Sequence, residues 1–208
     1  LKPENVFLAD SPTGERVRLL DFGSVRDRSG NLRRLTVLGT TIGSPLYMAP
    51  EQAQALDTLD HRADVWALTA LAYECLVGHP PFEGKGTAEI LMKIVAADPT
   101  PVSKVGTALG GTPPDLDAVV AWGLRKRAMD RPSSAGELAS AWGRAYGLDG
   151  HPSDWAEMKP EELRAAIDEA RPRWALQQGQ GAAVRRDSGG LVAAPPPGWG
   201  LEILEDPF

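Results

Sequence analysis

Cysteine is almost absent from this sequence, and its scarcity limits both the fold and the compartment. Cys75 is the single cysteine among 208 residues, so no disulfide can form within the chain. Chains without disulfides are typical of reducing compartments, and we therefore expect a cytoplasmic protein. Cys75 lies within the apolar run ALTALAYECLVG, which favours a buried, inert thiol over a reactive one.

Long apolar runs and an excess of positive charge are also missing. The sequence has neither a signal peptide nor an apolar run of about 18 residues, so we expect no membrane-spanning segment within it. An anchor on sequence outside these residues is left open. The net charge is −6, and the Lys and Arg residues are scattered along the chain. Nucleic acid is therefore not an expected partner.

The composition that remains is that of a soluble globular protein, but it changes near Gly147. Hydrophobic residues make up 42% of the chain and charged residues 24%, which is enough for one sizeable core. After Gly147 the segments HPSDW, QQGQG, DSGG and APPPGWG have the texture of a linker or tail. We predict a domain at 1–147 and a flexible C-terminal tail at 148–208. One short helix, KPEELRAAIDEAR, is expected at about 160–171 and either docks on the domain or stands free.

Apolar periodicity in the first part predicts a small β-hairpin followed by a mostly helical lobe. The runs NVFLAD and RVRLLDF are typical of two strands, and SPTGE between them supplies a turn. The segment 60–77 has a helical pattern and is almost wholly apolar after Asp64, as expected for a helix buried on most sides. Further helices are predicted at 87–97, 115–127 and 134–146, without another convincing strand. The predicted fold class is mainly α with one small hairpin.

Three short motifs occur in a meaningful order along the chain, namely KPEN at 2–5, DFG at 21–23 and APE at 49–51. Each motif alone is weak evidence, whereas the ordered set is strong. Together they resemble the catalytic-loop, magnesium and activation-segment motifs of Ser/Thr protein kinases, in particular the bacterial eukaryotic-like type. The resemblance covers about 1–146 and includes DHRADVWALTALAYECLVGHPPF and MDRPSSAGEL. It implies a kinase C-terminal lobe that takes part in transferring the ATP γ-phosphoryl to Ser or Thr of protein substrates.

The resemblance also assigns the residues that would handle ATP and Mg²⁺, the two expected cofactors. Phosphoryl transfer needs hard oxygen ligands for magnesium, and Asn5 and Asp21 match the metal ligands of the family. The hairpin between them would bring both side chains to the same end of the structure. Lys2 matches the catalytic-loop lysine, a point charge suited to the γ-phosphate and a mark of Ser/Thr specificity. Taken singly, each of these residues could belong to a surface turn, and for Lys2 and Asn5 that alternative is about as strong as the functional one.

The segment between the DFG and APE motifs resembles a kinase activation segment, being long, polar and basic in its first half. Thr36, Thr40 and Thr41 are candidate phosphoacceptors, because a phosphate there could order the loop through nearby arginines. The alternative is a solvated loop with ordinary threonines. Ser44 stands where the family usually has threonine in its Gly-Thr-x-x-Tyr pattern, and we expect its hydroxyl to bond the catalytic loop.

Glu51, Arg131 and Asp64 are better explained by structural roles than by chemistry. In the family, the APE glutamate pairs with a late arginine and ties the activation segment to the helical lobe, and arginine can meet a carboxylate bidentately. Glu51 and Arg131 occupy those positions. Asp64 begins the apolar helix and fits the family aspartate that holds the catalytic-loop backbone. The alternative for Asp64 is a simple helix N-terminal charge.

The sequence departs from the family pattern at its start. The Gly-rich loop, the strand-three lysine, its glutamate partner and the aspartate that accepts the substrate proton have no counterpart in it. We therefore interpret the chain as a truncated kinase that is inactive alone, and expect His-Arg-Asp or a close variant to be encoded directly before Leu1. The hairpin end should then expose an apolar patch suited to the missing N-terminal lobe. A non-catalytic interaction module derived from a kinase lobe is the alternative.

Overall fold

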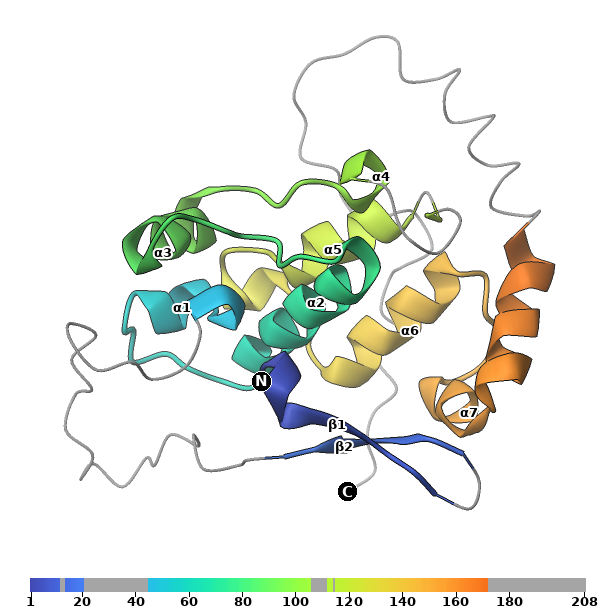
Figure 1. The fold of residues 1–208 in the computed structure, drawn as a ribbon. Helices are drawn as coiled ribbons and strands as arrows, with labels where there is room; N and C mark the ends of the chain where they lie inside the picture. Colours follow the sequence, from blue (N-terminus) through green and yellow to red (C-terminus); the bar gives the residue numbers. More distant parts are fainter. Residues whose placement is uncertain (12–13, 21–44, 106–111, 114, 172–208) are drawn as a thin grey trace, which may run out of the picture.

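A computed structural model describes residues 1–11, 14–20, 45–105, 112–113 and 115–171 (Figure 1). The elements, in chain order, are η1 (Pro3–Asn5), β1 (Val6–Ala9), β2 (Arg16–Leu19), η2 (Pro45–Tyr47), α1 (Pro50–Ala53), α2 (Arg62–Val77), α3 (Thr87–Ala96), α4 (Val102–Val105), α5 (Leu116–Gly123), η3 (Ala128–Asp130), α6 (Ala135–Ala145) and α7 (Pro152–Glu157). Residues 160–171 form a further helix. This arrangement confirms the predicted fold class of a mainly helical lobe with one hairpin. None of the helices in the described ranges is both long and apolar enough to cross a bilayer.

The α2 helix forms the centre of the core. Half of its sixteen residues are buried, and α4, α5, α6 and η2 all pack against it. Its close contact with α5 depends on Gly123, since a Cβ at that position would lie 2.2 Å from Thr69 Oγ1. The helix ends where Gly78 adopts a left-handed φ of 88° and its N–H donates to the Glu74 carbonyl at 2.7 Å. A glycine is favoured at such an end because it has no Cβ to clash.

The expectation of a buried thiol at Cys75 is wrong, because Cys75 is exposed. It belongs to an outward stripe of α2 that begins at Asp64 and continues through Leu68 and Leu71, all of them half-buried or exposed. The spacings of four, three and four residues keep these side chains on one helix face. Tyr73, two residues before Cys75, faces the core and is fully buried. An apolar run in the sequence therefore does not bury every residue that it contains.

The two strands pair in antiparallel fashion and expose much of their apolar surface. Val6 lies opposite Leu19 and Leu8 opposite Val17, so one face of the ribbon is wholly apolar. Leu8, Val17 and Leu19 on that face are 49–62% accessible. Phe7 and Leu20 alternate to the other face and are 55% and 48% accessible. A two-stranded ribbon has too little surface of its own to bury them. The structure thus has the expected apolar patch at the hairpin, which we call the hairpin patch.

The segment HPSDW, expected to be part of a linker, instead begins a helix. His151 precedes α7, and its N–H donates to the Asp154 carboxylate at 3.0 Å. Pro152 occupies the first turn, where its fixed φ suits a helix and its missing N–H costs nothing. The indole N–H of Trp155 donates to the Asp149 carbonyl at 2.8 Å. These local capping contacts, rather than apolar periodicity, determine the helix.

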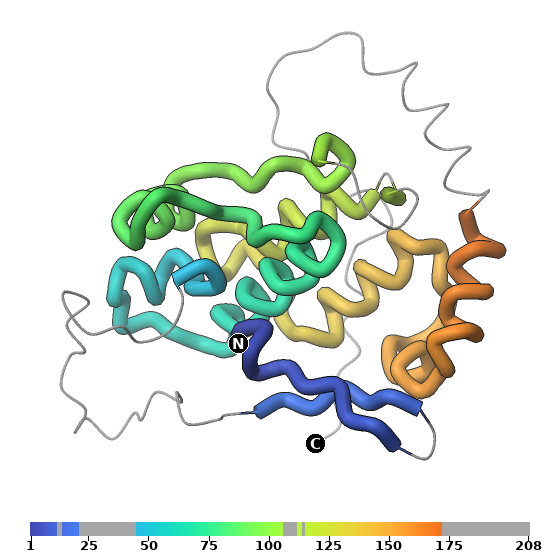
Figure 2. The backbone as a smooth tube through the Cα atoms, in the orientation of Figure 1, coloured from blue at the N-terminus to red at the C-terminus, as the bar shows by residue number. Residues whose placement is uncertain are grey.

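The helix at 160–171 docks on the lobe together with α7, on the side of α6 (Figure 2). Its apolar stripe of Leu163, Ala166 and Ile167 is half-buried, and Ala170 is fully buried. Described helical structure therefore continues beyond Gly147 to residue 171. The segments QQGQG, DSGG and APPPGWG lie outside the described residues.

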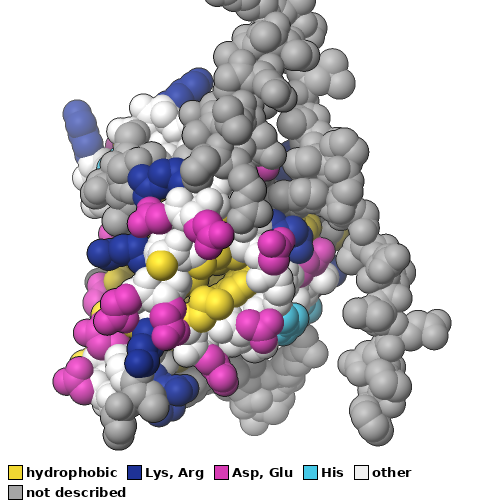
Figure 3. Space-filling model, turned by 90° about the vertical axis from the view of Figure 1, so that its right-hand side faces the viewer, with side chains coloured by type: hydrophobic (Ala, Val, Ile, Leu, Met, Phe, Trp, Pro, Cys, Tyr) yellow, Lys and Arg dark blue, Asp and Glu magenta, His cyan; other side chains and the backbone are white. Residues whose placement is uncertain are grey.

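The outer face of this C-terminal pair of helices is strongly charged. Figure 3 shows that face, with acidic and basic side chains around a small apolar area. Exposed charged residues of the helix at 160–171 include Glu161, Glu162, Arg164 and Asp168. The Asp168 carboxylate pairs with Arg171 at 2.7 Å within the same helix. This surface is typical of a solvated helix face.

Replacing Gly143 by alanine should lower the free energy of unfolding by about 1–3 kcal/mol, the usual cost of overpacking. The added Cβ would lie 2.1 Å from a ring carbon of Trp155, so α7 would have to move. Gly136→Ala in the same helix is the matched control, because the nearest atom to its Cβ would be Ser134 Oγ at 3.7 Å. That control should stabilise α6 by about 0.5–1 kcal/mol. Equal urea-unfolding stabilities of the two variants would show that α7 does not rest on Gly143.

Candidate functional site

The η1 turn holds Lys2 and Asn5 beside the hairpin. The N–H of Asn5 donates to the Lys2 carbonyl at 3.0 Å and closes the turn, in which Pro3 occupies the first position. The N–H of Leu20 donates to the Asn5 carbonyl at 2.8 Å, extending the strand ladder by one bond. Leu20 therefore lies against Asn5. The side chains of Lys2 and Asn5 are half-buried, and neither makes a hydrogen bond or ion pair within the described part of the chain.

Five residues assigned by sequence lie outside the described residues, and their roles stay predictions: Asp21, Thr36, Thr40, Thr41 and Ser44. In the ranges that the structure does describe, no three His, Cys, Asp or Glu side chains gather in a way that could hold a metal ion. The metal-ligand roles of Asn5 and Asp21 stay a prediction.

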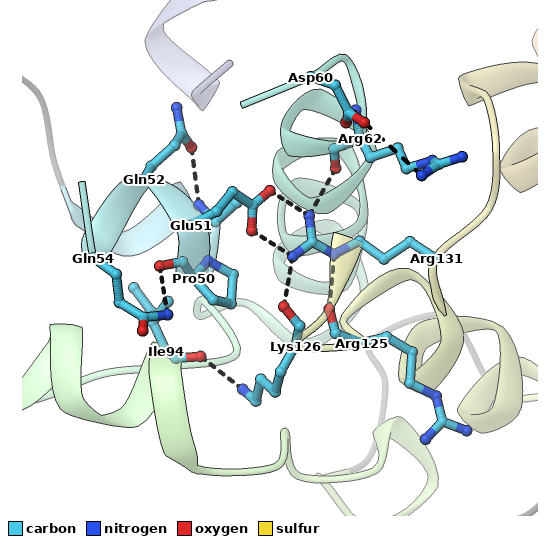
Figure 4. Close-up of polar contacts among 11 residues, drawn as sticks. Pro50, Glu51, Gln52, Gln54, Asp60, Arg62, Ile94, Arg125, Lys126 and Arg131 are labelled. Atoms are coloured by element: carbon cyan, nitrogen blue, oxygen red, sulfur yellow. Dashed lines mark hydrogen bonds and ion pairs between the residues drawn. The ribbon is translucent and has the colours of Figure 1, made fainter. Parts of the chain in front are cut away.

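Glu51 and Arg131 form a buried, bidentate ion pair (Figure 4). The two carboxylate oxygens of Glu51 each accept a hydrogen bond from a terminal guanidinium nitrogen, both at 2.7 Å. The side chain of Arg131 is 0% exposed and that of Glu51 is 6% exposed. Glu51 lies in the first turn of α1, where the Gln52 side chain accepts from the Ala49 N–H at 2.9 Å. The pair fastens α1 to a segment 80 residues away in the sequence.

Arg131 also binds three backbone carbonyls, so that every N–H of its guanidinium has an acceptor. Nε donates to the carbonyl of Arg125 at 2.7 Å, Nη1 to that of Arg62 at 3.0 Å, and Nη2 to that of Lys126 at 3.1 Å. With the two bonds to Glu51, these use all five donors. The guanidinium carbon also lies 5.0 Å from the Trp66 ring centroid. Arg131 thus holds α1, the start of α2 and the 125–131 segment together.

Asp64 lies in the first turn of α2 and is exposed. Its carboxylate makes no hydrogen bond or ion pair with the residues that the structure describes. A negative charge at this position favours the helix through the helix dipole. The contact to the catalytic-loop backbone, which the resemblance implies, stays a prediction.

Tyr47 of η2 contacts Glu74 of α2, a pair that the sequence motifs did not indicate. The buried Tyr47 hydroxyl donates to the Glu74 carboxylate. Burial, followed by this hydrogen bond and by the nearby charges of Glu74 and Glu4, raises the pKa of Tyr47 well above its ordinary value. The hydroxyl therefore remains a donor. The signals in the sequence were the tyrosine of GSPLYMAPE and a glutamate within an otherwise apolar helix.

Replacing Glu51 by glutamine should lower the free energy of unfolding by about 3–5 kcal/mol, because the Arg131 charge would stay buried without its counter-ion. The matched control is Glu89→Gln, since Glu89 pairs with Lys93 at 2.9 Å on the surface, where both side chains are nearly half exposed. That change should have little effect, because solvent screens exposed pairs. Chemical denaturation of the two variants measures the difference. Similar losses in both would mean that burial adds nothing to the Glu51–Arg131 pair.

Comparisons with known proteins agree with this geometry. The family described as "Protein kinase domain" matches residues 1–142. The chain is 37% identical over 150 residues to the serine/threonine-protein kinase pkn2 of Myxococcus xanthus, covering 70% of this chain and 18% of that protein. It is 36% identical over 141 residues to the serine/threonine-protein kinase PknE of Mycobacterium tuberculosis, covering 68% and 23% respectively.

A third relative extends the match further along the chain. The chain is 30% identical over 167 residues to the serine/threonine-protein kinase PknB of Mycobacterium tuberculosis, covering 80% of this chain and 25% of that protein. It thus spans no more than about a quarter of the length of these relatives. The kinase pattern nevertheless covers more than half of the chain and includes Lys2, Asn5, Glu51 and Arg131. The chain therefore belongs to the protein kinase family.

Proposed function

We propose that this chain supplies the magnesium-binding and substrate-facing lobe of a Ser/Thr protein kinase, which transfers the γ-phosphoryl of ATP to Ser or Thr side chains of protein substrates. The observation that carries the proposal is the 2.8 Å bond from the Leu20 N–H to the Asn5 carbonyl. It sets the residue before Asp21 against Asn5. That arrangement supports a shared role for the two side chains.

The residues near this point fit ATP and Mg²⁺. An amide oxygen from Asn5 and a carboxylate from Asp21 are the hard donors that Mg²⁺ prefers. Within the described part of the chain, the Asn5 amide and the Lys2 ammonium make no hydrogen bond or ion pair, which fits a role in binding metal and phosphate. The bound metal would neutralise charge on the phosphates. Lys2 would place a further positive charge beside the transferred group.

The hairpin patch supports an N-terminal kinase lobe as a partner. Its large apolar side chains, Phe7, Leu8, Val17, Leu19 and Leu20, are each about half exposed or more. Apolar surface of this kind usually marks an interaction site. It adjoins Lys2 and Asn5 through η1, so a lobe bound there would cover the proposed nucleotide site and exclude water from it.

The end of the activation segment is anchored at two points, which supports regulation by phosphorylation further upstream. Tyr47 is held by Glu74, and Glu51 by Arg131. A phosphate on Thr36, Thr40 or Thr41 would therefore act on a loop whose C-terminal end is already fixed. Charge-assisted bonds from a phosphate to arginines are strong enough to order such a loop.

The protein expressed from the complete reading frame that encodes this chain should transfer labelled phosphate from magnesium-ATP to a Ser/Thr acceptor protein. Asn5→Ala and Asp21→Ala should each reduce the rate by about 100-fold or more, because each removes a group that stabilises charge on the phosphates. Asp10→Asn, an exposed change after β1 and away from Asn5, is the control and should leave the rate unchanged. A folded protein that transfers no phosphate would favour the non-catalytic interaction module.

Mass spectrometry of the same active protein tests the regulatory part of the proposal. We expect phosphate on at least one of Thr36, Thr40 and Thr41, because the anchored segment would be ordered by added charge. Treatment with a phosphatase should then lower the rate. Full activity with all three threonines unmodified would contradict regulation by phosphorylation. It would not contradict the proposed reaction.

A further inference from the structure

Lys126 follows α5 and is half-buried in the lobe. Its Nζ donates to the carbonyl of Ile94 in α3 at 2.8 Å (Figure 4). The same nitrogen lies 4.3 Å from the ring centroid of Phe82 and 5.1 Å from that of Trp66. These two rings are stacked, with centroids 5.7 Å apart. A cation over aromatic faces is attracted by their negative charge.

The Ile94 carbonyl is one of those that a helix end leaves without a partner. The α3 helix ends at Ala96, and its last intrahelical bond runs from the Ala97 N–H to the Lys93 carbonyl at 2.8 Å. The following carbonyls have no helical donor. A lysine ammonium at such an end completes the hydrogen bonding and meets the negative pole of the helix dipole. Lys126 supplies this cap from 32 residues away.

The ammonium of Lys126 makes the stability of the lobe depend on pH. Burial of the ammonium lowers the pKa of Lys126 to about 8; Asp98 opposes the shift and Arg131 adds to it. A lowered lysine pKa means that the unfolded chain binds more protons between about pH 8 and the ordinary lysine value of 10.5. The free energy of unfolding therefore rises with pH through that window. Below about pH 8 the half-buried ammonium is charged, and this pH-dependent gain in stability is absent.

The backbone of Lys126 belongs to the network around the Glu51–Arg131 pair. Its carbonyl accepts from Arg131 Nη2 at 3.1 Å, and Arg131 holds Glu51 in α1. On the other side, α3 packs directly against α1 and η2. Lys126 thus contacts the end of α3 through its ammonium. Through its backbone carbonyl it contacts Arg131, the partner of Glu51.

We propose that Lys126 is a positioning residue whose cap on α3 makes α3, α1 and η2 a single rigid support for a bound protein substrate. The part that concerns substrate rests on the proposed function. The part that concerns rigidity follows from the contacts of Lys126 alone. The two parts can therefore be tested separately.

Lys126→Met removes the cap but keeps an apolar side chain of similar length against Phe82 and Trp66. By hydrogen exchange, the amides of residues 94–97 should exchange about tenfold faster than in the wild type, since the helix end frays without a cap. The melting temperature should stay the same or rise, because a buried charge is removed. Lys126→Arg keeps a donor and should retain most of the protection. Lys104→Met, on the exposed side of α4, is the control and should change nothing.

Two results would contradict the proposal that Lys126 caps the end of α3. In one, Lys126→Met leaves exchange at residues 94–97 within about twofold of the wild type. In the other, exchange rises evenly over the whole lobe, or the variant fails to fold, which would give Lys126 a general structural role. Hydrogen exchange and the melting temperature do not depend on phosphoryl transfer. Both therefore test the cap whether or not the chain belongs to an active kinase.

Kinetics of the complete protein then test the substrate part. Lys126→Met should raise KM for a protein substrate severalfold and leave KM for ATP unchanged, because α3 lies away from Lys2 and Asn5. Equal effects on both KM values would overturn substrate positioning. If exchange shows the cap but no variant transfers phosphate, the proposed function fails and the cap stands.

Discussion

The ion pair between Glu51 and Arg131 is the interaction on which the rest of the lobe depends. A guanidinium can be buried only if its charge and all its donors are satisfied, and here a carboxylate and three carbonyls meet that requirement. The acceptors come from α1, the first turn of α2 and the 125–131 segment. Because one planar group must reach all of them, their relative positions are fixed closely. Such a centre gives geometric definition more than it gives net stability.

Trp66 extends this centre toward α3. Arg131 and Lys126 both lie about 5 Å from its ring, and Phe82 stacks on it. Aromatic surfaces can accept two nearby cations where an aliphatic core would not, because the ring faces are negative. Burial lowers the pKa of Lys126, and the charge of Asp98 opposes that shift. The arrangement thus places a half-buried cation beside the end of α3.

The lobe presents two surfaces of opposite character. The hairpin patch is apolar and lies next to Lys2 and Asn5, whereas the outer face of α7 and the helix at 160–171 is charged. The first resembles an interface and the second a solvated surface. The segment that contains η2 and α1 is fastened to the helices at two points, by the Tyr47 contact with Glu74 of α2 and by the Glu51–Arg131 pair.

The family, the hairpin and the long helices can be predicted from the sequence, because strand alternation, helical periodicity and ordered motifs are local properties of the chain. It missed α7, which arises from capping contacts around Pro152, and it misplaced Cys75, since helix phase decides which residues of an apolar run face solvent. The resemblance named Glu51 and Arg131 as partners but not the three carbonyls that complete the site. The contact between Lys126 and the end of α3 could not be predicted, because a hydrogen bond that crosses 32 residues leaves no periodic signal in the sequence.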